Sequence, residues 1–113
     1  MKMSSISGVV CHVKDLDETA AFYEKLGFRL KREPAQLTAY VNWFWITFRP
    51  QEDGAVTHAG SHLYIKVEDI QAFYDGVQEL GLKPTTAPAK RSGMIEFELP
   101  DPDGYTLVFF WKK

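Results

Sequence analysis

The chain has a single cysteine, no long apolar run and almost no net charge, and each shortage excludes a class of protein. One cysteine among 113 residues forms neither an intramolecular disulfide nor a cysteine-based zinc cluster, which favours a reducing compartment. The opening MKMSSISGVV lacks the apolar run of a signal peptide, and no segment approaches the roughly 18 apolar residues of a membrane span. A formal net charge of -2 offers nucleic acid no basic face. We expect a cytoplasmic protein with no membrane or nucleic-acid partner.

Familiar catalytic signatures are also missing. The chain contains no Gly-rich phosphate loop, no G-x-S-x-G elbow and no H-E-x-x-H zinc motif. Asp101 and Asp103 belong to a turn and lack the further oxygen ligands of a calcium site. Glu96 and Glu98 project to one side of an expected strand about 6.6 Å apart, a spacing that acid–base pairs use and that polar faces of exposed strands also show.

The chain nearly repeats itself at half its length. The phrase GVVCHVKDL at residues 8–16 returns as HLYIKVEDI at residues 62–70, with a histidine where the first copy has a glycine. The same shift aligns LGF at 26–28 with LGL at 80–82. Such self-similarity indicates two copies of one structural unit.

Periodicity predicts the same order of elements in both copies. In the first, residues 5–13 alternate as a strand, a capping signature at 15–18 opens a helix that ends at Gly27, and residues 28–49 form three short strands with a turn at 42–43. The second has a strand at 62–67, a helix over 69–80 that stops at Gly81, and three strands, the last two joined by the turn Asp101-Pro102-Asp103-Gly104.

The predicted class is therefore α+β, with a βαβββ module twice in one domain of residues 1–113. Module 1 spans about 4–50, a polar linker spans 51–60, and module 2 spans about 61–113. His58 falls in that linker and is expected to be a solvated surface residue. Whether the modules pair within one chain or exchange between two chains stays open.

Alternation along the strands separates two faces. The apolar face is expected to pack beneath the helices and comprises Val9, Cys11, Val13, Phe44, Ile46, Phe48, Leu63, Ile65, Val67, Tyr105, Leu107, Phe109 and Trp111. The opposite, mixed face comprises Gly8, Val10, His12, Trp43, Trp45, Thr47, Arg49, His62, Tyr64, Lys66, Thr106, Val108 and Phe110. A face with this many aromatic and polar groups is expected to cover a ligand or another chain.

Three motifs together resemble those of the vicinal oxygen chelate superfamily, which includes glyoxalase I, extradiol dioxygenases, fosfomycin resistance enzymes and bleomycin resistance proteins. They are the duplicated V-x-D-L/I, FYEKLGF at 22–28 and DPDGYTLVF at 101–109. The resemblance covers essentially the whole chain. It implies U-shaped sheets whose paired modules enclose a cavity, a homodimer, and, in catalytic members, a divalent metal held by the opening and last strands of the modules.

Carried over residue by residue, the resemblance places the metal ligands at Gly8, near Thr47, at His62 and at Val108. Only His62 is a strong ligand, whereas a catalytic metal normally needs about three from the protein. His12 shares a face with Gly8 but lies about 13 Å further along the strand. The metal site is therefore expected to be lost and no cofactor to be needed.

The leading expectation is metal-independent binding of a small aromatic or cationic molecule, as in antibiotic or metabolite sequestration. The expected ligand-binding residues are Trp45, Trp43, His62, His12, Tyr64 and Arg49. Lys90 and Arg91 are either a ligand clamp on a loop or solvated cations, and Cys11 is expected to be an inert core residue.

Two alternatives stay open. The first is a metal-dependent enzyme, a glyoxalase-type lyase or an extradiol-type dioxygenase, which uses Ni, Zn, Mn or Fe with His62 as one ligand. The second is a subunit-interface module without a ligand, in which the two tryptophans hold a dimer together. Uptake of about one metal ion per site distinguishes the first, and dissociation of the dimer by a tryptophan substitution distinguishes the second.

Overall fold

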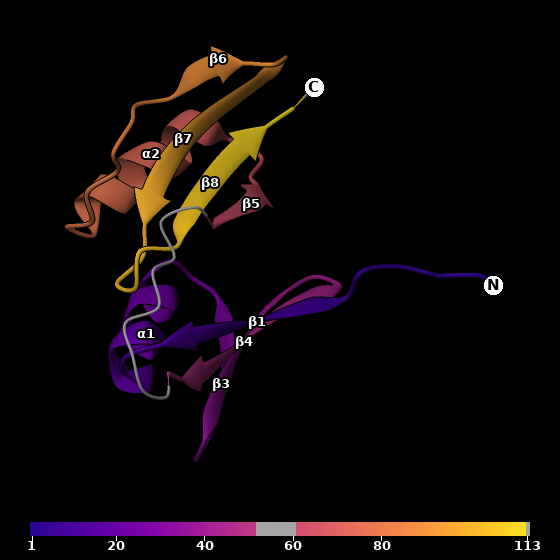
Figure 1. Ribbon diagram of the computed structural model, residues 1–113. Helices are drawn as coiled ribbons and strands as arrows, with labels where there is room; N and C mark the ends of the chain where they lie inside the picture. The colour runs from indigo at the N-terminus through magenta and orange to yellow at the C-terminus, as the bar shows by residue number, and fades with distance from the viewer. Residues whose placement is uncertain (52–60, 113) are drawn as a thin grey trace. The chain divides into compact units, whose positions relative to one another are not determined.

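The computed structural model describes residues 1–51 and 61–112 (Figure 1). Most of the expected linker, including His58, lies outside these residues. The chain divides into two units, residues 1–56 and 57–113, each with one strand, one helix and three further strands. The predicted α+β class and the βαβββ order in both halves are therefore confirmed. Within the described residues no helix has the length and the apolar character needed to cross a membrane.

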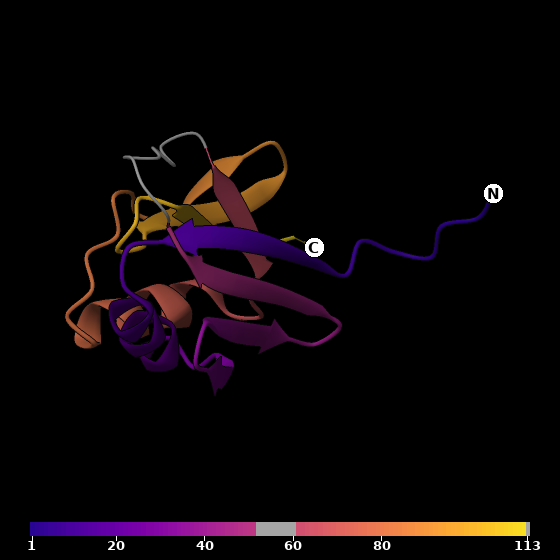
Figure 2. The same ribbon diagram turned by 60° about the horizontal axis from the view of Figure 1, so that its bottom comes forward.

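The first unit is a four-stranded mixed sheet with one helix. Its elements are β1 (Gly8–Val13), α1 (Leu16–Lys25), β2 (Arg29–Glu33), β3 (Gln36–Val41) and β4 (Phe44–Pro50). The strand order is β1-β4-β3-β2, with β1 parallel to β4 and the other pairs antiparallel. Figure 2 shows β1, β4 and β3 side by side with α1 against one face. The opening strand begins at Gly8 rather than at residue 5, although the Trp45 N–H still donates to the Ser7 carbonyl at 3.0 Å.

The second unit repeats this arrangement. Its elements are β5 (His62–Lys66), α2 (Ile70–Glu79), β6 (Ala89–Arg91), β7 (Met94–Pro100) and β8 (Thr106–Trp111). The order β5-β8-β7-β6 matches that of the first sheet, and β5 is parallel to β8 as β1 is to β4. In Figure 1, α2 lies against the face formed by β7 and β8. The repeat in the sequence is thus a repeat in the topology.

Both helices begin and end as predicted, for the same local reasons. The Asp15 carboxylate accepts from the backbone N–H groups of Asp17 at 2.9 Å and of Glu18 at 3.4 Å, and the Asp69 carboxylate caps α2 in the same way. Side-chain capping satisfies donors that a first helical turn leaves unpaired. Each helix stops just before a glycine with positive φ, 94° at Gly27 and 83° at Gly81, a backbone conformation that other residues adopt with strain.

Lys90 and Arg91 do not lie in a loop, in contrast to the expectation. Both residues lie in β6, which pairs antiparallel with β7. The two-residue connection made by Ser92 (φ 51°) and Gly93 (φ 78°) explains the difference, because positive φ at both positions produces the tight turn of a β-hairpin. The predicted turn at 101–104 is confirmed, with Gly104 at φ 90° between β7 and β8.

The predicted apolar faces form the two cores. The buried hydrophobic residues are Cys11, Val13, Leu16, Phe22, Tyr23, Leu37, Ala39, Ile46 and Phe48 in the first unit, and Val77, Phe97, Leu99, Tyr105, Leu107, Val108 and Phe109 in the second. In the first core Tyr23 is fully buried, 4.7 Å from Phe48 between ring centroids. Cys11 is buried on the core face, as expected of a thiol that packs as a small hydrophobe. Val108 was expected on the mixed face and is fully buried, although Tyr64, opposite it on the same face, is exposed.

Candidate functional site

One row of residues crosses the mixed face of the first sheet and combines aromatic rings with a cation. Strand register places Gly8 beside Trp45, Trp45 beside Tyr40, and Tyr40 beside Arg29. The Trp45 residue is 42% exposed, and the guanidinium carbon of Arg29 lies 5.6 Å from the centroid of the Tyr40 ring. A planar ligand can stack on such a surface, while the cation–π contact fixes the orientation of the neighbouring ring.

The Trp45 indole lies directly against Gly8. A Cβ atom added at residue 8 would overlap the indole ring at Nε1, Cε2 and Cδ1. Glycine is therefore favoured here by the limited space rather than by backbone conformation, since Gly8 is not among the glycines with positive φ. The indole occupies the volume that a larger side chain at residue 8 would need.

Replacing Gly8 with Ala is expected to displace this indole. Because Trp45 is partly exposed, its ring can swing outward, so the free energy of unfolding should fall by only about 1 kcal/mol. Tryptophan emission should shift to longer wavelength in the folded variant. Urea denaturation and emission spectra measure both effects. The losses in free energy of unfolding caused by Gly8→Ala and by Trp45→Ala should not be additive, because removing the indole also removes the overlap with the alanine side chain. Additive losses would mean that this overlap does not cause the destabilisation of Gly8→Ala.

In the next row on this face, two threonine hydroxyl groups form a hydrogen bond with each other. Thr47 lies opposite Thr38, and their Oγ1 atoms are 3.3 Å apart in a buried hydrogen bond. Thr38 and Thr47 are only 5% and 6% exposed. The Thr47 hydroxyl is therefore already paired within the sheet.

At the far edge of the same face, polar side chains form a chain of hydrogen bonds. The Arg49 Nε donates to Gln36 Oε1 at 3.3 Å, and the Gln36 amide donates to Glu33 Oε2 at 2.9 Å. His12 is opposite Arg49 in the register and is exposed. Three of the expected ligand-binding residues, Trp45, Arg49 and His12, thus share one sheet face. Trp43 instead lies in the β3–β4 turn and is 94% exposed, beyond the end of the strand that presents Trp45.

The mixed face of the second sheet carries the remaining expected residues. His62 and Tyr64 are exposed and lie on the same side of β5. The Tyr64 and Phe110 rings form an edge-to-face pair with centroids 5.9 Å apart. Val108 lies opposite Tyr64 in the register and is fully buried.

Glu96, which the sequence places on one strand face with Glu98, is buried, and strand alternation did not predict that burial. It lies on this mixed face, opposite Phe110, and is 7% exposed. In the described part of the chain neither carboxylate oxygen has a hydrogen-bond partner, and Arg91 Nε approaches Oε1 at 4.0 Å. The sequence placed Glu96 and Glu98 on one strand face, but alternation alone does not show whether that face is covered. The signal available was a glutamate between apolar residues in a strand flanked by Met94 and Leu99.

These residues do not provide the ligands of a divalent metal site. Gly8 has no donor and the Trp45 ring occupies its space, the Thr47 hydroxyl is bonded to Thr38, and Val108 has no donor. Among these four positions, only His62 carries a side chain of a type that binds metal ions strongly. Over residues 1–51 and 61–112 no group of three or more His, Cys, Asp or Glu side chains is placed to hold an ion. The donor set at the family positions therefore does not fit a catalytic metal.

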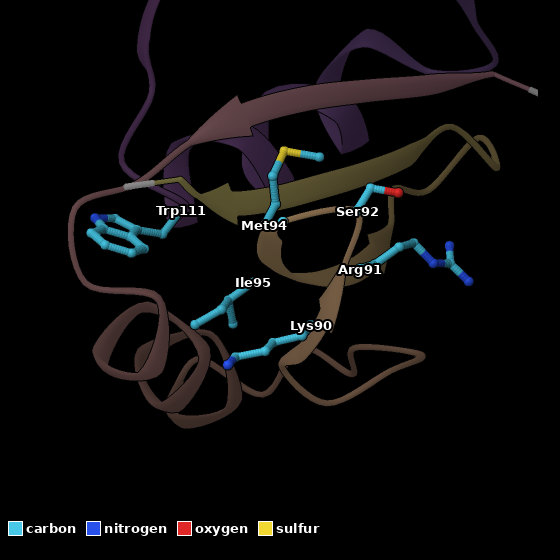
Figure 3. A pocket seen from close by; sticks show the side chains of 7 residues that line it. Lys90, Arg91, Ser92, Met94, Ile95 and Trp111 are labelled. Atoms are coloured by element: carbon cyan, nitrogen blue, oxygen red, sulfur yellow. The ribbon is translucent and has the colours of Figure 1, made fainter.

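A cavity of about 300 Å³ lies at the end of the β6–β7 hairpin in the second unit. Its lining residues are Lys90, Arg91, Ser92, Gly93, Met94, Ile95 and Trp111. Lys90, Ile95 and Trp111 are consecutive neighbours across three strands, and Figure 3 shows their side chains on one side while the Arg91 side chain extends away. Lys90 and Arg91 thus belong to the rim of a hollow with an aromatic wall.

Comparison with known proteins agrees with this architecture. The family model described as Glyoxalase/Bleomycin resistance protein/Dioxygenase superfamily matches residues 5–109. An integron cassette protein from V. cholerae superposes with a TM-score of 0.85 at 21% identity, covering 100% of this chain and 98% of its own. A putative glyoxalase family protein from Bacillus anthracis gives 0.85 at 19% identity with the same two coverages, 100% and 98%.

A bleomycin-binding protein complexed with bleomycin gives a TM-score of 0.76 at 23% identity, covering 98% of this chain and 100% of that one. Identities this low establish the fold alone. A search of curated proteins found no match. Since the family model spans nearly the entire sequence, this chain belongs to the glyoxalase, bleomycin resistance protein and dioxygenase superfamily.

Proposed function

We propose that this chain binds a small aromatic or cationic molecule without a metal ion, sequestering an antibiotic or a metabolite rather than transforming it. The observation that carries the proposal is the Trp45 indole lying against Gly8, the position at which the family resemblance would place a metal ligand. At this position the chain presents a stacking surface in place of a donor atom. The bleomycin-binding protein of the same fold supports small-molecule binding as a use of this architecture.

The surroundings of Trp45 suit a ligand that has both an apolar ring and polar atoms. Tyr40 and Arg29 continue the row beyond the indole, and Arg49 and His12 lie two rows away on the same face. Aromatic walls with a few polar groups at their edges are typical of small-molecule sites. We further propose a cytoplasmic homodimer, the form typical of small members of this superfamily.

Trp45→Ala is expected to weaken binding of planar probes about tenfold, because loss of the indole removes a stacking contact and its buried area. Calorimetric titration with bleomycin and with neutral 2-naphthol measures the dissociation constants without depending on the tryptophan signal. Trp43→Ala is the matched control, since that side chain is 94% exposed in a turn; its constants should stay within about twofold. Equal losses in the two variants would argue against a site at Trp45.

Two further measurements separate the alternatives. The same titration after dialysis against EDTA should give unchanged constants; a stoichiometric metal ion that His62→Ala releases would instead indicate a metal-dependent enzyme of the glyoxalase type. Sedimentation velocity of Trp45→Ala addresses the interface alternative. Dissociation of a dimer, with no probe binding by the wild-type chain, would make this face a subunit contact.

A further inference from the structure

Glu96 is a buried carboxylate that the fold leaves without a hydrogen bond. Its side chain is 8% exposed, and neither Oε1 nor Oε2 has a hydrogen-bond partner within the two described ranges. Buried polar groups are almost always paired, because an unpaired one loses its bonds to water and gains nothing in return. An exception of this kind requires either a structural partner or a functional reason.

Arg91 does not act as a structural partner with a full hydrogen bond. Its Nε lies 4.0 Å from Glu96 Oε1, beyond hydrogen-bond distance, and its side chain is 72% exposed. An ion pair with one partner so open to solvent contributes little to stability, whereas burial of the glutamate carboxylate costs its hydration free energy. Lys66 is on the same face but two strands away, with Phe110 between it and Glu96 in the register. Neither cation therefore satisfies the two oxygens.

Aromatic rings adjoin the carboxylate on the same sheet face. Phe110 is directly opposite Glu96, and its ring forms the edge-to-face pair with Tyr64. Cations bind favourably over aromatic faces, and N–H donors bind carboxylates strongly. The combination of an unpaired carboxylate with two rings is the chemistry that recognises a nitrogen cation bearing N–H groups.

We propose that the second unit binds a positively charged, N–H-bearing group, such as a primary ammonium, an amidinium or a guanidinium, and that Glu96 determines its specificity for that group. This inference rests on the proposed function, since it names the chemical class of cation that the chain binds. The two oxygens accept hydrogen bonds from the nitrogen group, and Phe110 and Tyr64 lie beside it. A quaternary ammonium carries the same charge but no N–H group, so it leaves both oxygens unpaired.

Three small probes test the proposal in the full chain. Benzamidine and benzamide have the same ring and a planar head group, but only benzamidine is a cation; benzyltrimethylammonium is a cation without N–H groups. We expect benzamidine to bind the wild-type chain about tenfold more tightly than either, measured by NMR titration, because hydrogen bonds to a charged group are the strong ones. Equal affinities for benzamidine and benzamide would overturn the proposal without any variant, and equal affinity for benzyltrimethylammonium would overturn its hydrogen-bonding part.

Glu96→Gln should abolish the preference for benzamidine. Glu79→Gln removes the same charge from an exposed position at the end of α2 and should preserve it, which excludes an effect of net charge. Without any ligand, Glu96→Gln should raise the midpoint of thermal unfolding, because a buried carboxylate without a hydrogen bond destabilises the free protein. If Glu96→Gln and Arg91→Gln both lower the midpoint, and the double variant lowers it no further, Glu96 is a structural ion-pair residue and the proposal fails.

The remaining outcomes distinguish this inference from the proposed function. Binding of 2-naphthol that depends on Trp45, with no preference among the three probes, would leave the proposed function standing and overturn the role of Glu96. A preference for benzamidine that depends on Glu96 but not on Trp45 would support the role of Glu96 and overturn the proposed stacking site at Trp45. If Glu96→Gln alters the oligomeric state and leaves probe affinities unchanged, the missing donor comes from a second copy of the chain, and the ligand role is overturned.

Discussion

Replacing Phe109 with Ala should lower the free energy of unfolding of the second unit by about 3–5 kcal/mol, the largest effect expected of any substitution considered for this chain. Phe109 is fully buried, and its ring centroid lies 4.5 Å from that of Phe73 on α2 and 5.3 Å from that of Phe97 on β7. Truncation removes an aromatic ring that contacts both the helix and the sheet. The cavity left behind adds to the cost because the surrounding strands relax only in part.

Urea denaturation measures this loss within the second unit. Trp43 and Trp45 belong to the first unit, so a background in which both are Phe leaves Trp111 as the fluorescent reporter for the second. Phe110→Ala is the matched control, since it is the next residue on the opposite face and is only half-buried; it should cost about 1 kcal/mol. Similar costs at both positions would mean that the two faces of β8 are wrongly assigned.

Asp101→Ala should cost about 2–3 kcal/mol, the second largest effect. The buried Asp101 carboxylate accepts from the backbone N–H groups of Asp103 and Tyr105, each at 2.9 Å, and so holds the β7–β8 turn closed. Charge-assisted hydrogen bonds are strong, and truncation leaves two donors without this acceptor.

Asp101→Asn is the matched control because it retains one acceptor oxygen. Since Oδ1 alone accepts both hydrogen bonds, the neutral side chain should lose less than half as much stability as alanine. Thermal unfolding followed by circular dichroism compares the three proteins. Equal losses from asparagine and alanine would show that the charge, rather than the acceptor geometry, stabilises the turn.

The fold was predictable because its signals are local. Asp15 and Asp69 cap helices through bonds to residues two or three positions away, and Gly27 and Gly81 end them through their own φ angles. Strand alternation likewise depends only on the pleat. The loop expected around Lys90 and Arg91 was wrong because the Ser92–Gly93 turn is short enough to be overlooked beside two prolines at 84 and 88.

The candidate site was only partly predictable because its decisive features are contacts across strands. Alternation along the strands predicts that Trp45 and His12 share a face. The contact between the Trp45 ring and Gly8 depends instead on strand register and on the side-chain rotamer, which alternation does not reveal. The burial of Glu96 is likewise not visible in a strand pattern, since a polar residue on a mixed face looks the same whether the face is wet or covered.

The contact between Gly8 and Trp45 couples two positions on neighbouring strands. A histidine or glutamate at position 8 needs the volume that the indole fills, so it would displace the ring from its present position. The effect of a substitution at position 8 therefore depends on which residue stands at position 45, and the order in which the two positions change affects the cost of each step.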